Sequence, residues 1–129
     1  MTLLALILAF VGGAAGSMCR FWLSGMVAQR FGATFPYGTL TVNVVGSWVI
    51  GFAAGWLVTH DAAFWAPLVK VFVAVGFCGG LTTFSAFGLQ TWSLVLSGRW
   101  VSALVNIFAS TGLCLGGVAL GWGLAQKVF

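Results

Sequence analysis

Four long stretches without a charged side chain follow one another along the chain, and short polar segments separate them. Each stretch is close to or longer than the roughly 20 apolar residues that a helix needs to cross a bilayer. We therefore predict an all-α membrane protein that forms one domain over residues 1–129. Its four transmembrane helices are expected near residues 3–25, 38–58, 68–96 and 101–124.

Composition and charge support this prediction. Hydrophobic residues make up 61% of the chain and charged residues only 5%, whereas a soluble domain carries roughly a quarter charged residues. The five basic residues are scattered singly, which argues against nucleic acid as a partner and favours the lipid bilayer. Because Arg20 follows the first apolar stretch instead of preceding it, we expect that stretch to be retained and not cleaved as a signal peptide.

Positive charges are distributed almost evenly between the two ends of the predicted helices. Arg30 and Arg99 lie in loops on one side, while Lys70 and Lys127 lie on the other. The orientation of a membrane protein follows an excess of Lys and Arg on one side, and no strong excess is present. The chain is therefore predicted to insert in both orientations and to pair as an antiparallel, dual-topology homodimer. The alternative is an orientation fixed by a signal that the charge count does not contain.

The third apolar stretch, Val71–Gly98, is long for a single crossing. Its 28 residues would extend roughly 42 Å as a continuous helix, which exceeds the roughly 30 Å of hydrocarbon. The glycine-rich sequence GFCGG, Gly76–Gly80, predicts a break of this third helix at mid-membrane. Unpaired carbonyls there are expected to line a wet cavity or to coordinate a small cation such as Na⁺. The alternative is a kinked helix packed against a neighbour.

Polar side chains also lie at membrane depth in the second and fourth stretches. Asn43 is in the second stretch. The fourth carries a stripe of polar residues at four-residue intervals: Ser102, Asn106, Ser110 and Cys114. Amide and hydroxyl groups can donate hydrogen bonds to an anion, although interhelical hydrogen bonding explains such residues equally well. Phe84 and Phe87 share a helical face, where they either pack or turn electropositive ring edges toward an anion.

The groups that the sequence lacks restrict the function. No acidic residue lies in a predicted span, and Asp61 lies in a loop beside His60. A proton-coupled exporter normally needs an intramembrane carboxylate or histidine, so this class is disfavoured. The sequence has no nucleotide-binding motif and no nucleophile–base pair, so we do not expect an enzyme. Arg20 is the one charge within a predicted span, and we expect a structural or electrostatic role for it rather than direct substrate binding.

Three segments of the sequence resemble the Fluc (CrcB) family of fluoride channels. GGLTTFSAF, Gly79–Phe87, is similar to the family signature GGxTTFSTF. GGAAGSMCRF in the first stretch is similar to the family's GGxxGAxxRY, and PYGTLTVNVVGSWVIG in the second to its GT..VN..G..IG. The similarity covers nearly the whole chain in order. Departures from the family pattern occur at Ser17, Phe21, Ala86 and Asn106.

The resemblance implies a passive, fluoride-selective ion channel in a bacterial plasma (inner) membrane, which exports cytoplasmic fluoride and so lowers its toxicity. It also implies an antiparallel homodimer with two pores along the subunit interface. The fluoride pore would be lined by Asn43, Thr83, Phe84, Ser85, Phe87 and Ser110. The backbone carbonyls of Gly79 and Thr82 would bind a structural Na⁺ at the dimer centre.

Other function classes stay open at this point. A small proton-coupled multidrug exporter also has four spans and dual topology, but it needs a carboxylate in its first span. A non-transporting scaffold subunit would account for glycine-rich helix faces but not for a polar break at mid-membrane. A fluoride/proton antiporter is a further alternative. Ion flux through the purified protein, and its dependence on pH, distinguishes these classes.

Overall fold

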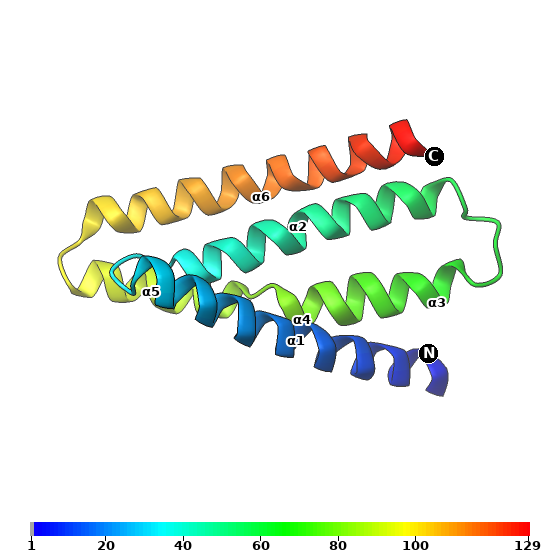
Figure 1. Cartoon of the computed structure of the whole chain (residues 1–129), viewed down its shortest axis with the longest axis horizontal. Coiled ribbons are helices and arrows are strands. Elements are labelled where there is room, and N and C mark those ends of the chain that lie inside the picture. Colours follow the sequence, from blue (N-terminus) through cyan, green and yellow to red (C-terminus); the bar gives the residue numbers. More distant parts are fainter. Residues whose placement is uncertain (1) are drawn as a thin grey trace.

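The structure is a computed structural model that describes residues 2–129, and it is helical apart from short connections. Three helices are continuous, whereas the third membrane-length segment consists of several helical pieces (Figure 1). In chain order the elements are α1 (Leu3–Phe31), α2 (Tyr37–Val58), α3 (Ala66–Lys70), the π-helix η1 (Val71–Cys78), α4 (Gly79–Leu81), α5 (Phe84–Leu96) and α6 (Trp100–Val128).

Four segments are long and apolar enough to cross a membrane: Leu3–Phe31, Tyr37–Val58, Ala66–Leu96 and Trp100–Val128. The prediction of an all-helical protein with four helices able to span a membrane is confirmed. Some helices run past the predicted spans, because nothing in the sequence stops them earlier. The first continues to Phe31 and ends at Gly32, whose φ of 85° favours glycine. The segment Ala66–Leu96 is called the third segment below.

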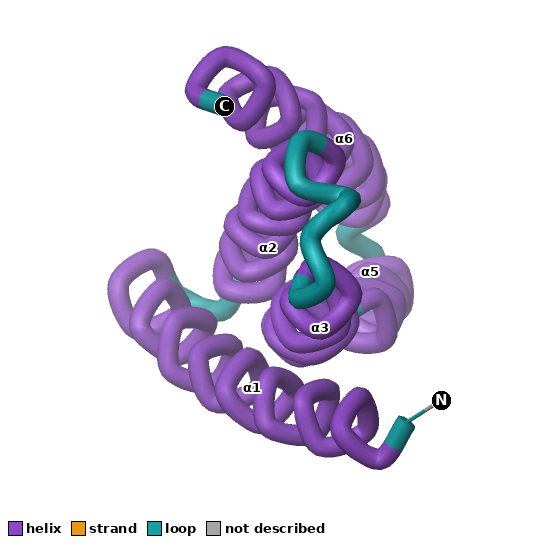
Figure 2. The backbone as a smooth tube through the Cα atoms, turned by 90° about the vertical axis from the view of Figure 1, so that its right-hand side faces the viewer, coloured by secondary structure: helices purple, strands orange, loops and turns teal. Residues whose placement is uncertain are grey.

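Close packing at glycines joins α2 to α6. These helices lie side by side, and α1 packs against η1 and α4 on the opposite side of the bundle (Figure 2). A Cβ atom added to Gly55 would lie 3.1 Å from the Trp122 carbonyl oxygen, and one added to Gly121 would lie 2.7 Å from the Phe52 nitrogen. Helices in a membrane associate through such packing, because the surrounding lipid offers no hydrophobic driving force between them.

The contact between α1 and the third segment is also made at glycines. A Cβ added to Gly80 would lie 2.9 Å from the Ser17 nitrogen, whereas one added to Gly79 would find its nearest neighbour, the Ala74 carbonyl oxygen, at 3.9 Å. The stretch Gly76–Gly80 is helical throughout, so the expectation that these glycines themselves unwind is wrong. The small size of Gly76 and Gly80 lets α1 approach the backbone of this stretch.

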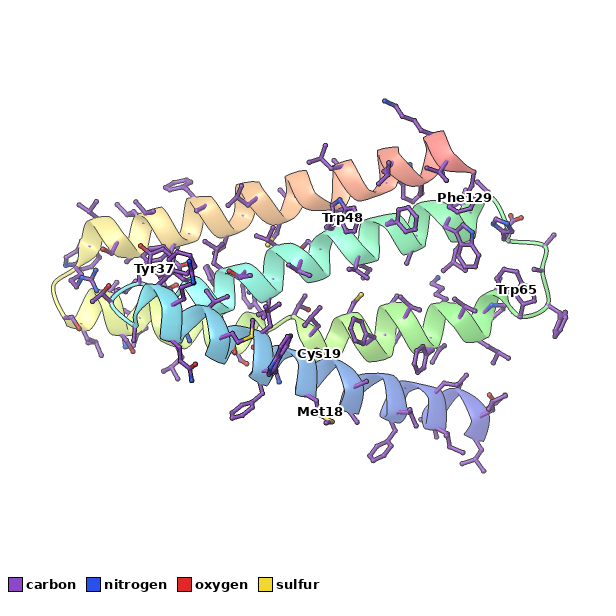
Figure 3. All side chains as sticks on the ribbon, in the orientation of Figure 1. Met18, Cys19, Tyr37, Trp48, Trp65 and Phe129 are labelled. Carbon is purple, nitrogen blue, oxygen red and sulfur yellow. The ribbon has the colours of Figure 1, made fainter. Side chains whose placement is uncertain are left out.

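Aromatic side chains gather at the end of the bundle that holds the α2–α3 connection and the C-terminus. The rings of Trp56 and Trp65 stack with centroids 5.4 Å apart, and His60 lies against both. Figure 3 shows Trp65 and Phe129 at this end. Tryptophan at the ends of spanning helices is typical of the membrane–water interface, so this cluster marks one boundary of the membrane-embedded region.

Candidate functional site

Two residues of extended backbone lie in the middle of the third segment. Thr82 has φ −88° and ψ 156°, and Thr83 has φ −152° and ψ 116°. These angles belong to the β region and not to a helix. The Thr82 amide still donates to the Cys78 carbonyl at 2.9 Å. The Thr83 amide leaves the helical series and needs another acceptor, because an unpaired backbone group within a membrane is very costly.

Asn43 on α2 provides that acceptor. Its Oδ1 atom accepts a hydrogen bond from the Thr83 amide at 2.7 Å, and its Nδ2 atom donates to the Thr83 carbonyl at 3.1 Å. One side-chain amide thus pairs with both backbone groups of an extended residue. Asn43 retains a second amide hydrogen, because an NH₂ group carries two donors. Its predicted contact with fluoride would have to use that hydrogen, and it stays a prediction.

The same arrangement releases several backbone carbonyls from helical pairing, and those of Gly79 and Thr82 are among them. In a continuous helix, the Gly79 carbonyl would accept from the Thr83 amide and the Thr82 carbonyl from the Ala86 amide. Both donors are engaged elsewhere, because Thr83 donates to Asn43 and Ala86 donates to Thr83 Oγ1 at 3.2 Å. Unwound carbonyls of this kind can coordinate Na⁺. Within residues 2–129 no group of three His, Cys, Asp or Glu side chains could hold a metal ion.

Thr83 also begins α5. Its Oγ1 atom caps the helix by accepting the Ala86 amide, and it lies 3.2 Å from Ser85 Oγ. The two hydroxyls carry two protons, and the bond between them uses one. One hydroxyl proton is therefore free for a ligand. The free amides at the N-terminus of α5 add partial positive charge at the same place.

A cavity of about 470 Å³ adjoins the extended residues. Most of the predicted site residues line it: Asn43, Gly79, Thr82, Thr83, Phe84, Phe87 and Ser110. The rings of Phe84 and Phe87 have centroids 5.4 Å apart and are inclined by 37°. Phe84 is 84% exposed, so this side of the cavity is open in the single chain. The lining combines neutral hydrogen-bond donors with apolar rings and carries no formal charge.

Arg20 lies apart from this group. It lines a second cavity of about 390 Å³ together with Ser24, Thr39, Gln90 and Thr83, so Thr83 is common to both cavities. The Gln90 Oε1 atom is buried and has no hydrogen-bond partner within residues 2–129. Gln90 was not among the site residues predicted from the sequence. Its position seven residues after Thr83, on the same helical face, was the available signal.

Polar residues of α6 bond to α5 beside the first cavity. Asn106 Nδ2 donates to Thr91 Oγ1 at 2.9 Å, and Ser110 Oγ donates to Asn106 Oδ1 at 3.2 Å. Thr91 Oγ1 in turn donates to the Phe87 carbonyl at 2.7 Å. Asn106 is 1% exposed, so the stripe of polar residues predicted on this helix makes interhelical hydrogen bonds at that position.

Comparison with known proteins assigns the chain to a family. Residues 7–122 match the family model described as CrcB-like protein, Camphor Resistance (CrcB). The chain belongs to the CrcB family. The fluoride-specific ion channel FluC 3 of Brucella suis is 48% identical over 123 residues, which cover 95% of this chain and 92% of the relative. FluC of Opitutus terrae is 50% identical over 111 residues, which cover 86% and 84%. FluC of Roseiflexus is 43% identical over 116 residues, which cover 90% and 92%.

Membership in the CrcB family confirms the resemblance found in the sequence motifs. In this CrcB chain, the structure brings seven predicted site residues to one cavity. Ser85 adjoins them through its contact with Thr83, whereas Arg20 lines the neighbouring cavity. The individual roles of these residues stay predictions.

Proposed function

We propose that this CrcB chain is a passive, fluoride-selective ion channel that lets cytoplasmic fluoride leave the cell and so lowers its toxicity. The relatives named above are fluoride-specific ion channels and align with most of the chain. The structural observation that carries the proposal is the cavity of about 470 Å³, where hydrogen-bond donors and two phenylalanine rings meet the extended residues. The relatives are channels and not enzymes, in agreement with the absence of catalytic motifs.

Selectivity for fluoride follows from donors that replace its hydration shell. Such donors are the hydroxyl proton that the Thr83–Ser85 bond leaves free and the second amide hydrogen of Asn43. The Ser110 hydroxyl joins them when its proton is released from Asn106. The ring edges of Phe84 and Phe87 attract an anion weakly. Because no formal charge lines this cavity, the ion can also leave, as conduction requires. A narrow path built from these groups would exclude the larger chloride.

We propose a Na⁺ ion as a structural cofactor at the dimer centre, held by the carbonyl oxygens of Gly79 and Thr82. Support comes from the loss of the helical donors of both carbonyls, since Thr83 pairs with Asn43 and Ala86 with the Thr83 hydroxyl. When bound, the ion would supply positive charge next to the cavity. Arg20 adds positive potential from the neighbouring cavity, which favours entry of anions without a direct contact.

We propose that the functional unit is an antiparallel, dual-topology homodimer in the bacterial inner membrane, with a break in the third helix of each copy. Two observations support this proposal. The positive charges are almost balanced between the two sides. The ring of Phe84 is largely exposed at the open side of the cavity, where a second copy could cover it.

The proposal is tested by fluoride efflux from liposomes that contain the purified protein, recorded with a fluoride electrode. Fast fluoride efflux that needs a potassium ionophore, with no chloride efflux from matched liposomes, is the expected result. Such a result identifies electrogenic passive transport. Efflux that requires a pH gradient would instead support the fluoride/proton antiporter, and an absence of ion flux from folded protein would overturn the proposal.

A further inference from the structure

Three hydrogen bonds in series connect α6 to α5, and all of them point in the same direction. Ser110 donates to Asn106, Asn106 donates to Thr91, and Thr91 donates to the Phe87 carbonyl. Only the two ends, Ser110 and Phe87, line the cavity of about 470 Å³. Asn106 lies behind this lining and is 1% exposed, so it cannot reach an ion in the cavity directly.

The direction of this series decides what Ser110 offers to the cavity. A serine hydroxyl has one proton and two acceptor lone pairs. While that proton is donated to Asn106 Oδ1, only lone pairs remain on the cavity side, and lone pairs repel an anion. Ser110 can bind fluoride only when its proton is released from Asn106.

We propose that Asn106 is a positioning residue that controls the Ser110 proton by reversing this series. If the side-chain amide of Asn106 turns over, its nitrogen donates to Ser110 Oγ and its oxygen accepts from the Thr91 hydroxyl. The Ser110 proton is then directed into the cavity. The Phe87 carbonyl keeps its helical partner, the Thr91 amide, so no backbone group is left unpaired.

Asn106 makes two hydrogen bonds both in the series seen in the structure and in the reversed series. The reversal exchanges the bond from Thr91 to the Phe87 carbonyl for a bond from Ser110 to the ion. A hydrogen bond to an ion is roughly twice as strong as one between neutral groups. The reversed series, in which Ser110 donates to the ion, is therefore favoured while fluoride occupies the cavity. The series seen in the structure is favoured when the ion has left. Ser110 therefore donates into the cavity only while an anion is bound there.

The inference rests on the proposed fluoride conduction, because it assigns the ion in this cavity. The test is a double-mutant cycle with Asn106→Leu and Ser110→Ala, measured as fluoride efflux over a range of fluoride concentrations. Ser110→Ala should raise the concentration for half-maximal flux roughly 3- to 10-fold, as expected for one lost hydrogen bond. Asn106→Leu removes the acceptor that competes for the Ser110 proton and should lower this concentration. If Asn106 acts through Ser110, the double variant should equal Ser110→Ala alone.

Thr91 provides a second route should Asn106→Leu fail to fold. Thr91→Val removes the hydroxyl whose bond to the Phe87 carbonyl is given up on reversal, so it should lower the concentration for half-maximal flux. Thr91→Ser keeps the hydroxyl and should stay near the wild-type value. Thr41→Val is the matched control, because it removes the same kind of bond, from Thr41 Oγ1 to the Tyr37 carbonyl, away from the cavity. Thr91→Val should also have no further effect in the Ser110→Ala background.

The outcomes separate the inference from the proposed function. Wild-type protein that conducts no fluoride overturns both. Wild-type conduction with effects that multiply in the double variants overturns the inference alone, as does an unchanged half-maximal concentration in Asn106→Leu and Thr91→Val. Wild-type conduction with no added effect in the Ser110→Ala background supports it.

Discussion

The glycines of Gly76–Gly80 and the threonines Thr82 and Thr83 are neighbours in the third segment, but they have opposite conformations. The glycines are helical, and two of them, Gly76 and Gly80, pack against α1. The threonines are extended and are held by Asn43 of α2. Conformational freedom is greatest at glycine, yet the backbone leaves the helix at two β-branched residues. A helix within a membrane unwinds where another group accepts its hydrogen bonds, and not merely where its residues are flexible.

The largest effect is expected from Asn43→Leu, which removes the partner of the extended residues. Both partly buried backbone groups of Thr83 would lose their bonds to this side chain, at a cost of at most about 2–6 kcal/mol for the two. Thermal unfolding in detergent should show this loss, and fluoride efflux should be abolished. Asn43→Asp retains the acceptor for the Thr83 amide and should be less destabilised. Equal stability of wild type and Asn43→Leu would contradict the role assigned to this side chain.

The next largest effect is expected on transport, from the loss of a phenylalanine ring beside the extended threonines. Phe84→Ala or Phe87→Ala should reduce fluoride efflux at least roughly tenfold, the equivalent of about 1.4 kcal/mol. Within one subunit Phe84→Ala should remove little packing, because that ring is largely exposed there. Phe10→Ala is the matched control, since Phe10 is 77% exposed and lies on α1 away from the cavity. Full transport by both cavity variants would show that these rings do not contribute to the pore.

A smaller effect compares two adjacent glycines. Gly80→Ala places a Cβ within 2.9 Å of the Ser17 nitrogen, whereas Gly79→Ala meets nothing closer than 3.9 Å. Overpacking of this kind costs about 1–3 kcal/mol. The unfolding temperature in detergent should therefore fall for Gly80→Ala and stay nearly constant for Gly79→Ala. The opposite ranking would contradict the close packing of Gly80 against α1.

The smallest effect is expected at the Thr82 side chain. Its hydroxyl donates to the Cys78 carbonyl at 2.9 Å, which already accepts the Thr82 amide. Thr82→Val preserves the β-branched shape and loses only this bond, at a cost of about 0.5–1.5 kcal/mol. Fluoride efflux should persist in this variant, because the proposed Na⁺ ligand is the backbone carbonyl. A complete loss of efflux would assign a direct role to the hydroxyl.

The helices themselves could be predicted because their uncharged stretches are long. Their ends could not, since α1 continues through Arg20 and Arg30 until Gly32. Polar residues near a membrane boundary do not stop a helix when water or headgroups can solvate them. The third segment differs because its irregular backbone depends on a contact between residues 43 and 83, which are distant in sequence.

Most of the candidate site could be found from side-chain chemistry at membrane depth. The motif Gly79–Phe87 contains the rings and hydroxyls that meet at the cavity. The partnership of Asn106 with Thr91 could not be predicted, because it depends on the register between α5 and α6. Gln90 was not predicted, because its place seven residues after Thr83 is a weak signal and most residues that line its cavity lie on α1 and α2.

The order of synthesis gives the bond between Asn43 and Thr83 a further consequence. The ribosome makes α2 before the third segment, so the acceptor for the Thr83 amide already exists when the extended residues emerge. The third segment can enter the bilayer with its polar backbone paired at once. The contacts of Asn106 with α5 must wait for α6, the last helix to be made. Chain order therefore lets the bond between Asn43 and Thr83 form before the bond between Asn106 and Thr91.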